Sequence, residues 1–240
     1  MQLLENRVAI ITGGTGALGR AVTKNFLTAG AKVAIPWVIE AEVPMLETQL
    51  GNRFPSTELF LKKADVADEK QISDFVGEVA SQWSKVDILV NLVGGFWGGK
   101  SVAQTTMQEW QTMFDLNVRP TFICCRAVVP IMQRGKWGRI VSVTSRTGLL
   151  GAGDFAAYAV AKGAIATFTA SLAEEVLPDN VLVNAIAPST IDTEANRKAM
   201  PNAKHEKWVK PEDIARTLAF LCSDDCRATA GAIVPVYGKA

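Results

Sequence analysis

The sequence predicts a single doubly wound α/β domain, in which a mainly parallel, seven-stranded sheet is covered by helices on both faces. Short apolar segments rich in β-formers alternate along the chain with segments whose apolar residues recur at helical spacing. The strand segments are almost continuously apolar, as is typical of parallel strands buried on both faces. No internal repeat or linker divides the 240 residues, so we expect one domain over residues 1–240.

The expected elements follow in chain order. Strands are predicted at residues 7–11, 31–35, 59–62, 86–90, 139–143, 181–187 and 232–237. Helices are predicted from about residue 21 to Gly30, and at 44–50, 68–83, 106–133, about 158–177 and 211–222. Pro36 is expected to end the second strand, and Pro120 and Pro130 to interrupt the fourth helix, because proline lacks a backbone N–H. Asp68 is expected to cap the third helix.

A glycine-rich turn joins the first strand to the first helix. Gly14, Gly16 and Gly19 fit the pattern G-x-G-x-x-G between a strand and a helix, the setting that this pattern requires. Glycines let the backbone approach a pyrophosphate, whose charge the amides and dipole of the helix N-terminus stabilise. The turn therefore predicts a dinucleotide-binding domain of the Rossmann type.

The residues after the second strand favour NAD over NADP as the cofactor. A carboxylate there would bind the 2′-hydroxyl of the adenosine ribose, whereas an arginine would favour a 2′-phosphate. The nearby acid is Glu40, which comes a few residues late, and no basic residue occurs between Lys32 and Arg53. Arg20 and Lys24 could reach the site from the first helix, so NADP stays the alternative.

Tyr158 and Lys162 are the candidate proton-transfer residues. Four positions apart in an alanine-rich segment, they would lie one turn apart on the same helix face. A cation about 4 Å from a phenol, at an effective dielectric of about 20, is worth about 4 kcal/mol, or about three pKa units. That shift would bring the phenol pKa close to neutrality. The same spacing also occurs by chance on helix surfaces, so the pair needs supporting motifs, and Ser145 precedes it by thirteen residues.

Composition excludes two classes of partner. Lys and Arg number 25 against 24 Asp and Glu, so no basic excess is present to bind nucleic acid or an anionic membrane. We find no apolar run approaching the eighteen or more residues of a membrane-spanning helix, and no cationic and then hydrophobic leader at the N-terminus. We therefore expect a cytoplasmic protein.

The four cysteines, Cys124, Cys125, Cys222 and Cys226, are expected to be buried thiols. Cys222 and Cys226 lie four apart on a predicted helix and could share a metal. However, His205 is the single histidine and no carboxylate cluster completes a site. We expect no metal.

Several motifs in this order resemble the short-chain dehydrogenase/reductase family, and the resemblance covers essentially the whole chain. They are the turn from Thr12 to Gly19, Asn91, Asn117, Ser145 and the pair Tyr158-x-x-x-Lys162. The resemblance implies that Tyr158 is the acid or base, and that Lys162 holds the nicotinamide ribose and lowers the Tyr158 pKa. Ser145 would bond the substrate oxygen, and Asn117 would hold a water linking Lys162 to solvent.

The resemblance also implies the cofactor contacts. Asp65 would contact the adenine, Asn91 and Gly94 would line the cofactor, and Ile191 and Thr193 would meet the nicotinamide end. The full expected set is Gly13, Thr15, Gly16, Ala17, Leu18, Gly19, Trp37, Asp65, Val66, Asn91, Gly94, Tyr158, Lys162, Pro188, Ile191 and Thr193. Four positions depart from the family pattern: Ala17 and Ser189 replace usual glycines, and Leu92-Val93 replaces Asn-Ala.

A narrower resemblance, to dihydropteridine reductases, lies in residues 190–201, Trp208 and the glycine-rich loop 94–99. Ser145 and Trp37 argue against that identity, because such enzymes need no carbonyl-binding serine and would carry an NADH-selecting acid at position 37. Phe96 and Trp97 could stack on a flat substrate, or could equally pack within the domain or against a subunit.

These observations predict an NAD(P)-dependent oxidoreductase that interconverts a small carbonyl compound and a secondary alcohol, similar to 3-oxoacyl carrier-protein reductase. The alternatives are a pterin-ring reductase and, in another class, a non-catalytic dinucleotide-sensing protein. Residues 188–210 are expected to form a lid over the substrate. The family resemblance implies a dimer or homotetramer, and apolar residues at 124–132 would be surplus to a monomer core if they face outward.

Overall fold

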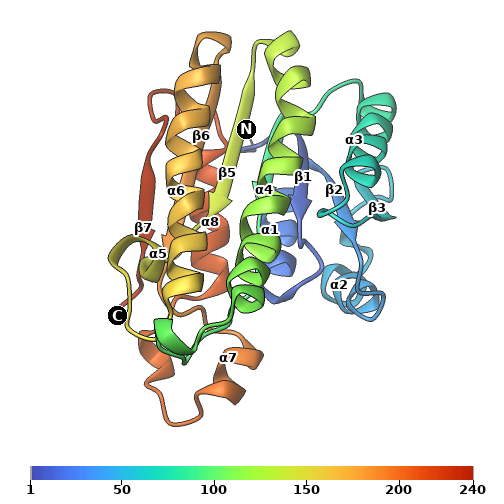
Figure 1. Cartoon of the computed structure of the whole chain (residues 1–240). Helices are drawn as coiled ribbons and strands as arrows, with labels where there is room; N and C mark the ends of the chain where they lie inside the picture. The colour runs from blue at the N-terminus through green and yellow to red at the C-terminus, as the bar shows by residue number, and fades with distance from the viewer. Residues whose placement is uncertain (1, 240) are drawn as a thin grey trace.

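A computed structural model of the chain describes residues 2–239 and contains one seven-stranded sheet, in the order β3-β2-β1-β4-β5-β6-β7. Every pair of neighbouring strands in it is parallel. The prediction of a doubly wound α/β fold is therefore confirmed, and the sheet is entirely parallel. In Figure 1, α4 and α6 lie in front of the sheet and α1 and α8 behind it.

The bounds of the elements are as follows. The strands are β1 (Val8–Thr12), β2 (Lys32–Trp37), β3 (Leu59–Lys63), β4 (Ile88–Asn91), β5 (Gly138–Val143), β6 (Val181–Pro188) and β7 (Ile233–Val236). The α-helices are α1 (Ala17–Thr28), α2 (Glu42–Leu50), α3 (Glu69–Trp83), α4 (Met107–Gly135), α5 (Arg146–Leu150), α6 (Ala156–Val176), α7 (Glu194–Ala199) and α8 (Pro211–Leu221).

Two apolar cores lie on the two faces of the sheet. Along β1, Ala9 and Ile11 join the core shared with α1, α2 and α8, whereas Val8 and Ile10 join the core shared with α3, α4 and α6. This alternation follows from the two-residue period of a strand. Since both faces are covered, ligands have access to this sheet at the ends of its strands.

The second strand continues through Pro36, contrary to the expectation that this residue ends it. The Val33 N–H donates to the carbonyl of Glu58, which directly precedes β3. Along β2, odd-numbered residues therefore point their N–H groups toward β3, and even-numbered residues point theirs toward β1. The register between β1 and β2 ends at Ala34. The N–H that Pro36 lacks would therefore point to a side where no partner strand remains.

The fourth helix also continues through its prolines. Pro120 and Pro130 both lie inside the 29-residue α4, which runs unbroken from Met107 to Gly135. The N-terminus is held by a capping box between Thr106 and Glu109, and packing on α6 and α3 stabilises the body of the helix. Asp68 caps α3 as expected, because its side chain accepts a hydrogen bond from the Gln71 amide.

Two short helices, α5 and α7, occur where the sequence predicts none. Ser145 caps α5 and Thr193 caps α7, each through a side-chain oxygen that accepts an amide hydrogen bond. Both helices span too few residues to show a helical period. In Figure 1, α7 lies beyond the carboxyl edge of the sheet, within the segment expected to be a lid.

The helix α6 corrects the expectation about apolar runs. Residues 156–179 are long and apolar enough to cross a membrane by length and composition alone, with a mean hydropathy of 1.2. However, α6 packs against α4, α5 and β6 within the domain, and it contains the buried, charged Lys162. We therefore interpret α6 as a core helix.

Candidate active site

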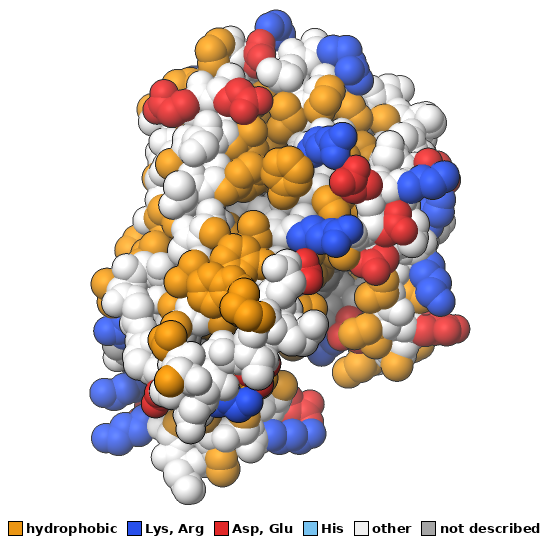
Figure 2. All heavy atoms as spheres, in the orientation of Figure 1, with side chains coloured by type: hydrophobic (Ala, Val, Ile, Leu, Met, Phe, Trp, Pro, Cys, Tyr) orange, Lys and Arg blue, Asp and Glu red, His pale blue; other side chains and the backbone are white. Residues whose placement is uncertain are grey.

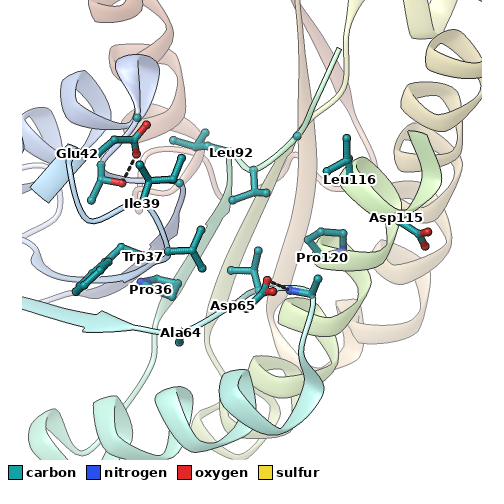
Figure 3. A pocket seen from close by; sticks show the side chains of 18 residues that line it. Pro36, Trp37, Ile39, Glu42, Ala64, Asp65, Leu92, Asp115, Leu116 and Pro120 are labelled. Atoms are coloured by element: carbon teal, nitrogen blue, oxygen red, sulfur yellow. Dashed lines mark hydrogen bonds between the residues drawn. The ribbon is translucent and has the colours of Figure 1, made fainter. Parts of the chain in front are cut away.

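A cavity of about 360 Å³ opens at the carboxyl ends of β1, β2 and β3. Strand order reverses at β1, because β2 lies on one side of it and β4 on the other. Such a switch point is where open parallel sheets bind ligands. Figure 3 shows Trp37, Ile39 and Glu42 on one side of this cavity and Asp115, Leu116 and Pro120 on the other.

The glycine turn between β1 and α1 brings backbone segments into close contact. Gly13 has a φ of +66°, and a Cβ at Gly19 would lie 1.9 Å from the Gly13 carbonyl oxygen. Gly16 caps α1 without any side chain occupying the first amides of the helix. Because the turn leaves these N–H groups open beside the cavity, the residues present fit a dinucleotide pyrophosphate.

Replacing Gly19 with alanine should abolish dinucleotide binding. The new Cβ would meet Gly13 and Gly14 backbone atoms, so the turn must move by about an ångström or more. We expect a loss of about 1–3 kcal/mol in the free energy of unfolding, and no detectable NADH titration. Gly77→Ala is the matched control, since a Cβ added at Gly77 in α3 would meet no atom within 4 Å. Because alanine favours a helix over glycine, this control should raise the free energy of unfolding by about 0.5–1 kcal/mol. NADH binding by folded Gly19→Ala protein would contradict this assignment.

Ser145 and Tyr158 come together at the carboxyl end of β5. Ser145 lies two residues beyond β5, where its Oγ accepts a hydrogen bond from the Gly148 amide at 2.9 Å. Tyr158 lies in the first turn of α6, with its phenol close enough to Ser145 for that side chain to lower its pKa. The structure therefore brings two of the predicted catalytic residues together.

Lys162 lies one turn further along α6 and is almost completely buried. Its Nζ donates to the Val143 carbonyl at 3.0 Å, and it would lie 3.0 Å from a Cβ at Gly94. Burial lowers the pKa of Lys162 to about 8. The ammonium thus lies between the end of β5 and the loop that follows β4.

Asn117 holds this same loop in place. Its side-chain Nδ2 donates to the Gly95 carbonyl at 3.0 Å, and its Oδ1 accepts from the Gly95 amide at 3.2 Å. A Cβ at Gly94 would lie 2.7 Å from the Asn117 Oδ1. Asn117 and Lys162 therefore both border Gly94.

The pKa of Tyr158 corrects one expectation. Burial raises this pKa above its ordinary value, and the contact with Ser145 opposes the rise without cancelling it. Lys162 is not among the groups that shift this pKa, and its ammonium donates to the Val143 carbonyl. In this structure the phenol is therefore protonated at neutral pH.

The predicted cofactor residues divide into two groups. Gly13, Thr15, Gly16, Trp37, Asp65, Val66 and Gly94 line the cavity. Asn91 lies inside the sheet, where its Nδ2 donates to the Ser142 hydroxyl at 3.1 Å. The Thr193 hydroxyl caps α7, and Ile191 forms an isolated bridge with Val209 at the base of the expected lid. Roles toward a cofactor stay predictions for the whole expected set, including Ala17, Leu18, Gly19, Tyr158, Lys162 and Pro188, which do not line the cavity.

Several lining residues lie outside the predicted set, and Glu42 is the most informative. Its Oε2 accepts a hydrogen bond of 2.7 Å from the hydroxyl of Thr15, across 27 residues of sequence. Asp115, Leu116 and Pro120 of α4 also line the cavity. No sequence pattern indicates these residues, because each depends on how α2 and α4 dock beside the sheet.

The cysteines and the histidine take no part in this site. All four thiols are buried and free, and burial raises the pKa values of Cys124, Cys125 and Cys222. Within residues 2–239, no group of three or more His, Cys, Asp and Glu side chains could hold a metal. His205 contacts the Met200 carbonyl through Nε2 at 2.9 Å and packs against Trp208.

Fold and site together define a class: a Rossmann-type domain with an open glycine turn at its switch-point cavity and a serine, a tyrosine and a lysine near the carboxyl end of β5. Residues 7–204 match the family model described as short chain dehydrogenase. The chain belongs to this family of NAD(P)-dependent dehydrogenases and reductases.

Relatives match the chain over nearly its full length. A 3α-hydroxysteroid dehydrogenase of Mediterraneibacter gnavus is 32% identical, with 99% of this chain and 98% of the relative covered. A 3-oxoacyl-acyl-carrier-protein reductase of Chlamydia trachomatis is 30% identical, with 98% of both chains covered. The crystal structure of levodione reductase superposes with a TM-score of 0.92 at 27% identity, covering 98% of this chain and 97% of that one.

Proposed function

We propose that the chain interconverts a ketone and a secondary alcohol through Ser145, Tyr158 and Lys162. The observation that carries the proposal is that Ser145 lies close to Tyr158 at the carboxyl end of β5, while Lys162, one turn further along α6, contacts the Val143 carbonyl and borders Gly94 of the cavity lining. A nicotinamide cofactor supplies or accepts the hydride when it is bound. The relatives named as hydroxysteroid dehydrogenase and 3-oxoacyl carrier-protein reductase support the same reaction class.

Each residue has a separate role in this proposal. Tyr158 gives a proton to the carbonyl oxygen, and its raised pKa keeps it in the donating form at neutral pH. Ser145 donates a hydrogen bond to the same oxygen and orients it. Lys162 holds positive charge beside the loop at Gly94, and Asn117 fixes that loop. Asn117 would also hold the water that links Lys162 to solvent.

The direct experiment titrates the protein with NADH and NADPH and then screens carbonyl compounds with the preferred cofactor. We expect substrate-dependent oxidation of the cofactor with at least one ketone. The screen includes quinonoid pterins as a second substrate class. Cofactor binding without turnover across the panel would instead support a dinucleotide-sensing protein.

One specific observation favours a flat ring as the substrate. Phe96 is 68% exposed in the glycine-rich loop, yet its ring stacks on Phe155 at 5.6 Å and meets the Tyr158 ring edge-on at 5.0 Å. An exposed aromatic face beside the proposed acid can stack on a flat ring. Reduction of a pterin-like ring is therefore the second candidate function, and a cyclic ketone would use the same surface.

Ser145→Ala distinguishes the two candidates. If Ser145 orients a carbonyl oxygen, its loss should lower kcat by about 100-fold or more. Reduction of a pterin ring should change little, because that reaction needs no carbonyl-binding serine. Ser145 also caps α5, so thermal unfolding is measured alongside, and Ser145→Thr serves as the control that keeps a hydroxyl. Equal loss of carbonyl activity in both variants would argue against the hydroxyl as the orienting group.

We also propose that copies of the chain associate through α4 and α6, as a dimer or tetramer. Cys124, Cys125, Val128, Val129 and Met132 are buried in the monomer, so they are not the surplus apolar face expected from sequence. Phe122 is instead 49% exposed and meets Phe168 of α6 edge-on. Figure 2 shows hydrophobic side chains gathered along this face. We propose, in addition, that the protein is cytoplasmic.

A further inference from the structure

We infer that Glu42 selects the cofactor: its carboxylate accepts a hydrogen bond from the 2′-hydroxyl of the adenosine ribose in NAD(H) and excludes the 2′-phosphate of NADP(H). The inference deepens the proposed function, since it rests on the chain binding a dinucleotide. It does not depend on the substrate or on the catalytic roles of Ser145 and Tyr158.

The position of the adenosine ribose follows from the two ends of the cavity, the glycine turn before α1 and the residues after β3. The pyrophosphate fits the open amides at the start of α1, and Asp65 and Val66, after β3, line the far part of the cavity. Strand β2 lies between β1 and β3. A dinucleotide that spans these points must pass its adenosine ribose over the carboxyl end of β2.

The residue at the end of β2 itself cannot select the cofactor by charge. Trp37 occupies that place, where a carboxylate would hold the 2′-hydroxyl of NAD. Five residues later, at the start of α2, Glu42 returns its side chain toward the glycine turn. The Thr15 hydroxyl, which is buried, holds the Glu42 Oε2 at 2.7 Å, and Figure 3 shows this bond at the rim of the cavity.

This hydrogen bond fixes the carboxylate and leaves Oε1 to accept from a ligand. A ribose 2′-hydroxyl can donate to Oε1, because a hydroxyl carries one donor. A 2′-phosphate has acceptor oxygens and up to two negative charges, so it would face the carboxylate with repulsion and without a donor at neutral pH. The same atom therefore attracts one cofactor and repels the other.

The charges around the cavity reinforce this selection. Its lining includes three acids, Glu42, Asp65 and Asp115, and no Lys or Arg among the described residues. Two cations contact lining residues without lining the cavity themselves: the Arg20 guanidinium donates to the Thr15 carbonyl at 2.9 Å, and the Lys63 ammonium lies 5.9 Å from the centre of the Trp37 ring. Neither side chain lines the cavity, where a 2′-phosphate site requires a cation.

The test is a binding titration with NADH and NADPH, without substrate, by calorimetry on the full chain. We expect wild-type protein to bind NADH at least about tenfold more tightly than NADPH, which corresponds to about 1.4 kcal/mol. Glu42→Gln should bring the two affinities together, mainly by strengthening NADPH binding. The matched control is Glu40→Gln, because Glu40 is an exposed acid two positions away that does not line the cavity. Its ratio should equal that of wild type.

Three outcomes would overturn the inference. The first is equal affinity of the wild-type protein for NADPH and NADH. This result would refute the role of Glu42 but would leave the proposed function standing. An equal change in the ratio for Glu40→Gln and Glu42→Gln would show that net charge decides, rather than the held carboxylate. Binding of neither dinucleotide would remove the proposed function as well. The wild-type ratio does not depend on the folding of any variant.

Discussion

Tyr158→Phe protein should bind NADH as wild type does and lose about 100- to 10,000-fold in kcat with a ketone substrate, the range that a positioned proton donor supplies. The substitution removes only the phenol oxygen. The ring should keep its edge-on contact with Phe96 and its place in the first turn of α6. Loss of the polar contact with Ser145 should change the free energy of unfolding by about 1 kcal/mol or less. Cofactor oxidation measures the activity, and the NADH titration shows that the site is intact.

The chain offers a matched control, because it contains two tyrosines. Tyr237 lies next to β7, with its ring beneath the Arg146 guanidinium at 5.1 Å. Tyr237→Phe removes the same atom and keeps that contact, so its kcat should stay close to that of wild type. Full activity in folded Tyr158→Phe protein would refute the proposed mechanism.

The parts of the site that could be predicted from sequence are those set by local geometry. The Tyr158 and Lys162 pair follows from the period of one helix, and the glycine turn from a strand and a helix adjacent in the chain. Asp68 at the start of α3 is predictable for the same reason. Each involves residues close together in sequence, where the conformation of a short segment decides the arrangement.

Other features depend on contacts between distant segments. Thr15 and Glu42 meet because α2 docks against the glycine turn. Pro36 is tolerated in β2 because the ladder with β1 has already ended, which depends on register between strands. The direction of the Tyr158 pKa shift depends on burial, and no single segment specifies how deeply a side chain is covered.

The short helix α5 depends both on local sequence and on contacts between distant segments. The sequence predicts Ser145 as a substrate-binding hydroxyl, and in the structure its oxygen also caps α5 through the Gly148 amide. A Cβ at Gly148 would lie 2.7 Å from the Lys162 Cβ, so α5 packs directly on the part of α6 that carries Lys162. The cap therefore helps to position α6, and with it Tyr158 and Lys162, relative to the end of β5.

Lys162→Met should abolish most activity and also change how stability depends on pH. Methionine matches the apolar stem of lysine but supplies no charge and no donor for the Val143 carbonyl. We expect kcat to fall by about 100-fold or more, and dinucleotide affinity to fall with it. The same cofactor oxidation assay and NADH titration measure both losses.

The pH dependence follows from the lowered pKa of Lys162, about 8 in the folded chain against an ordinary 10.5. The folded state disfavours the charged form, so below about pH 8 the wild-type protein carries the full destabilisation, of roughly 3 kcal/mol. As pH rises from 8 toward 10.5, the unfolded chain still holds this proton and the folded chain releases it. Wild-type stability should therefore rise across this window relative to Lys162→Met.

Denaturant unfolding at about pH 7 and about pH 10 measures this difference, and subtracting the variant from wild type removes the other titrating groups. Lys70→Met is the control, because Lys70 is an exposed lysine on α3 that pairs with Asp74 at the surface, where solvent screens the pair. A wild-type minus Lys162→Met difference that does not change with pH would mean that Lys162 titrates as it does in water. The ammonium would then be solvated, and it could not serve as the buried charge beside Gly94 on which the proposed role of Lys162 depends.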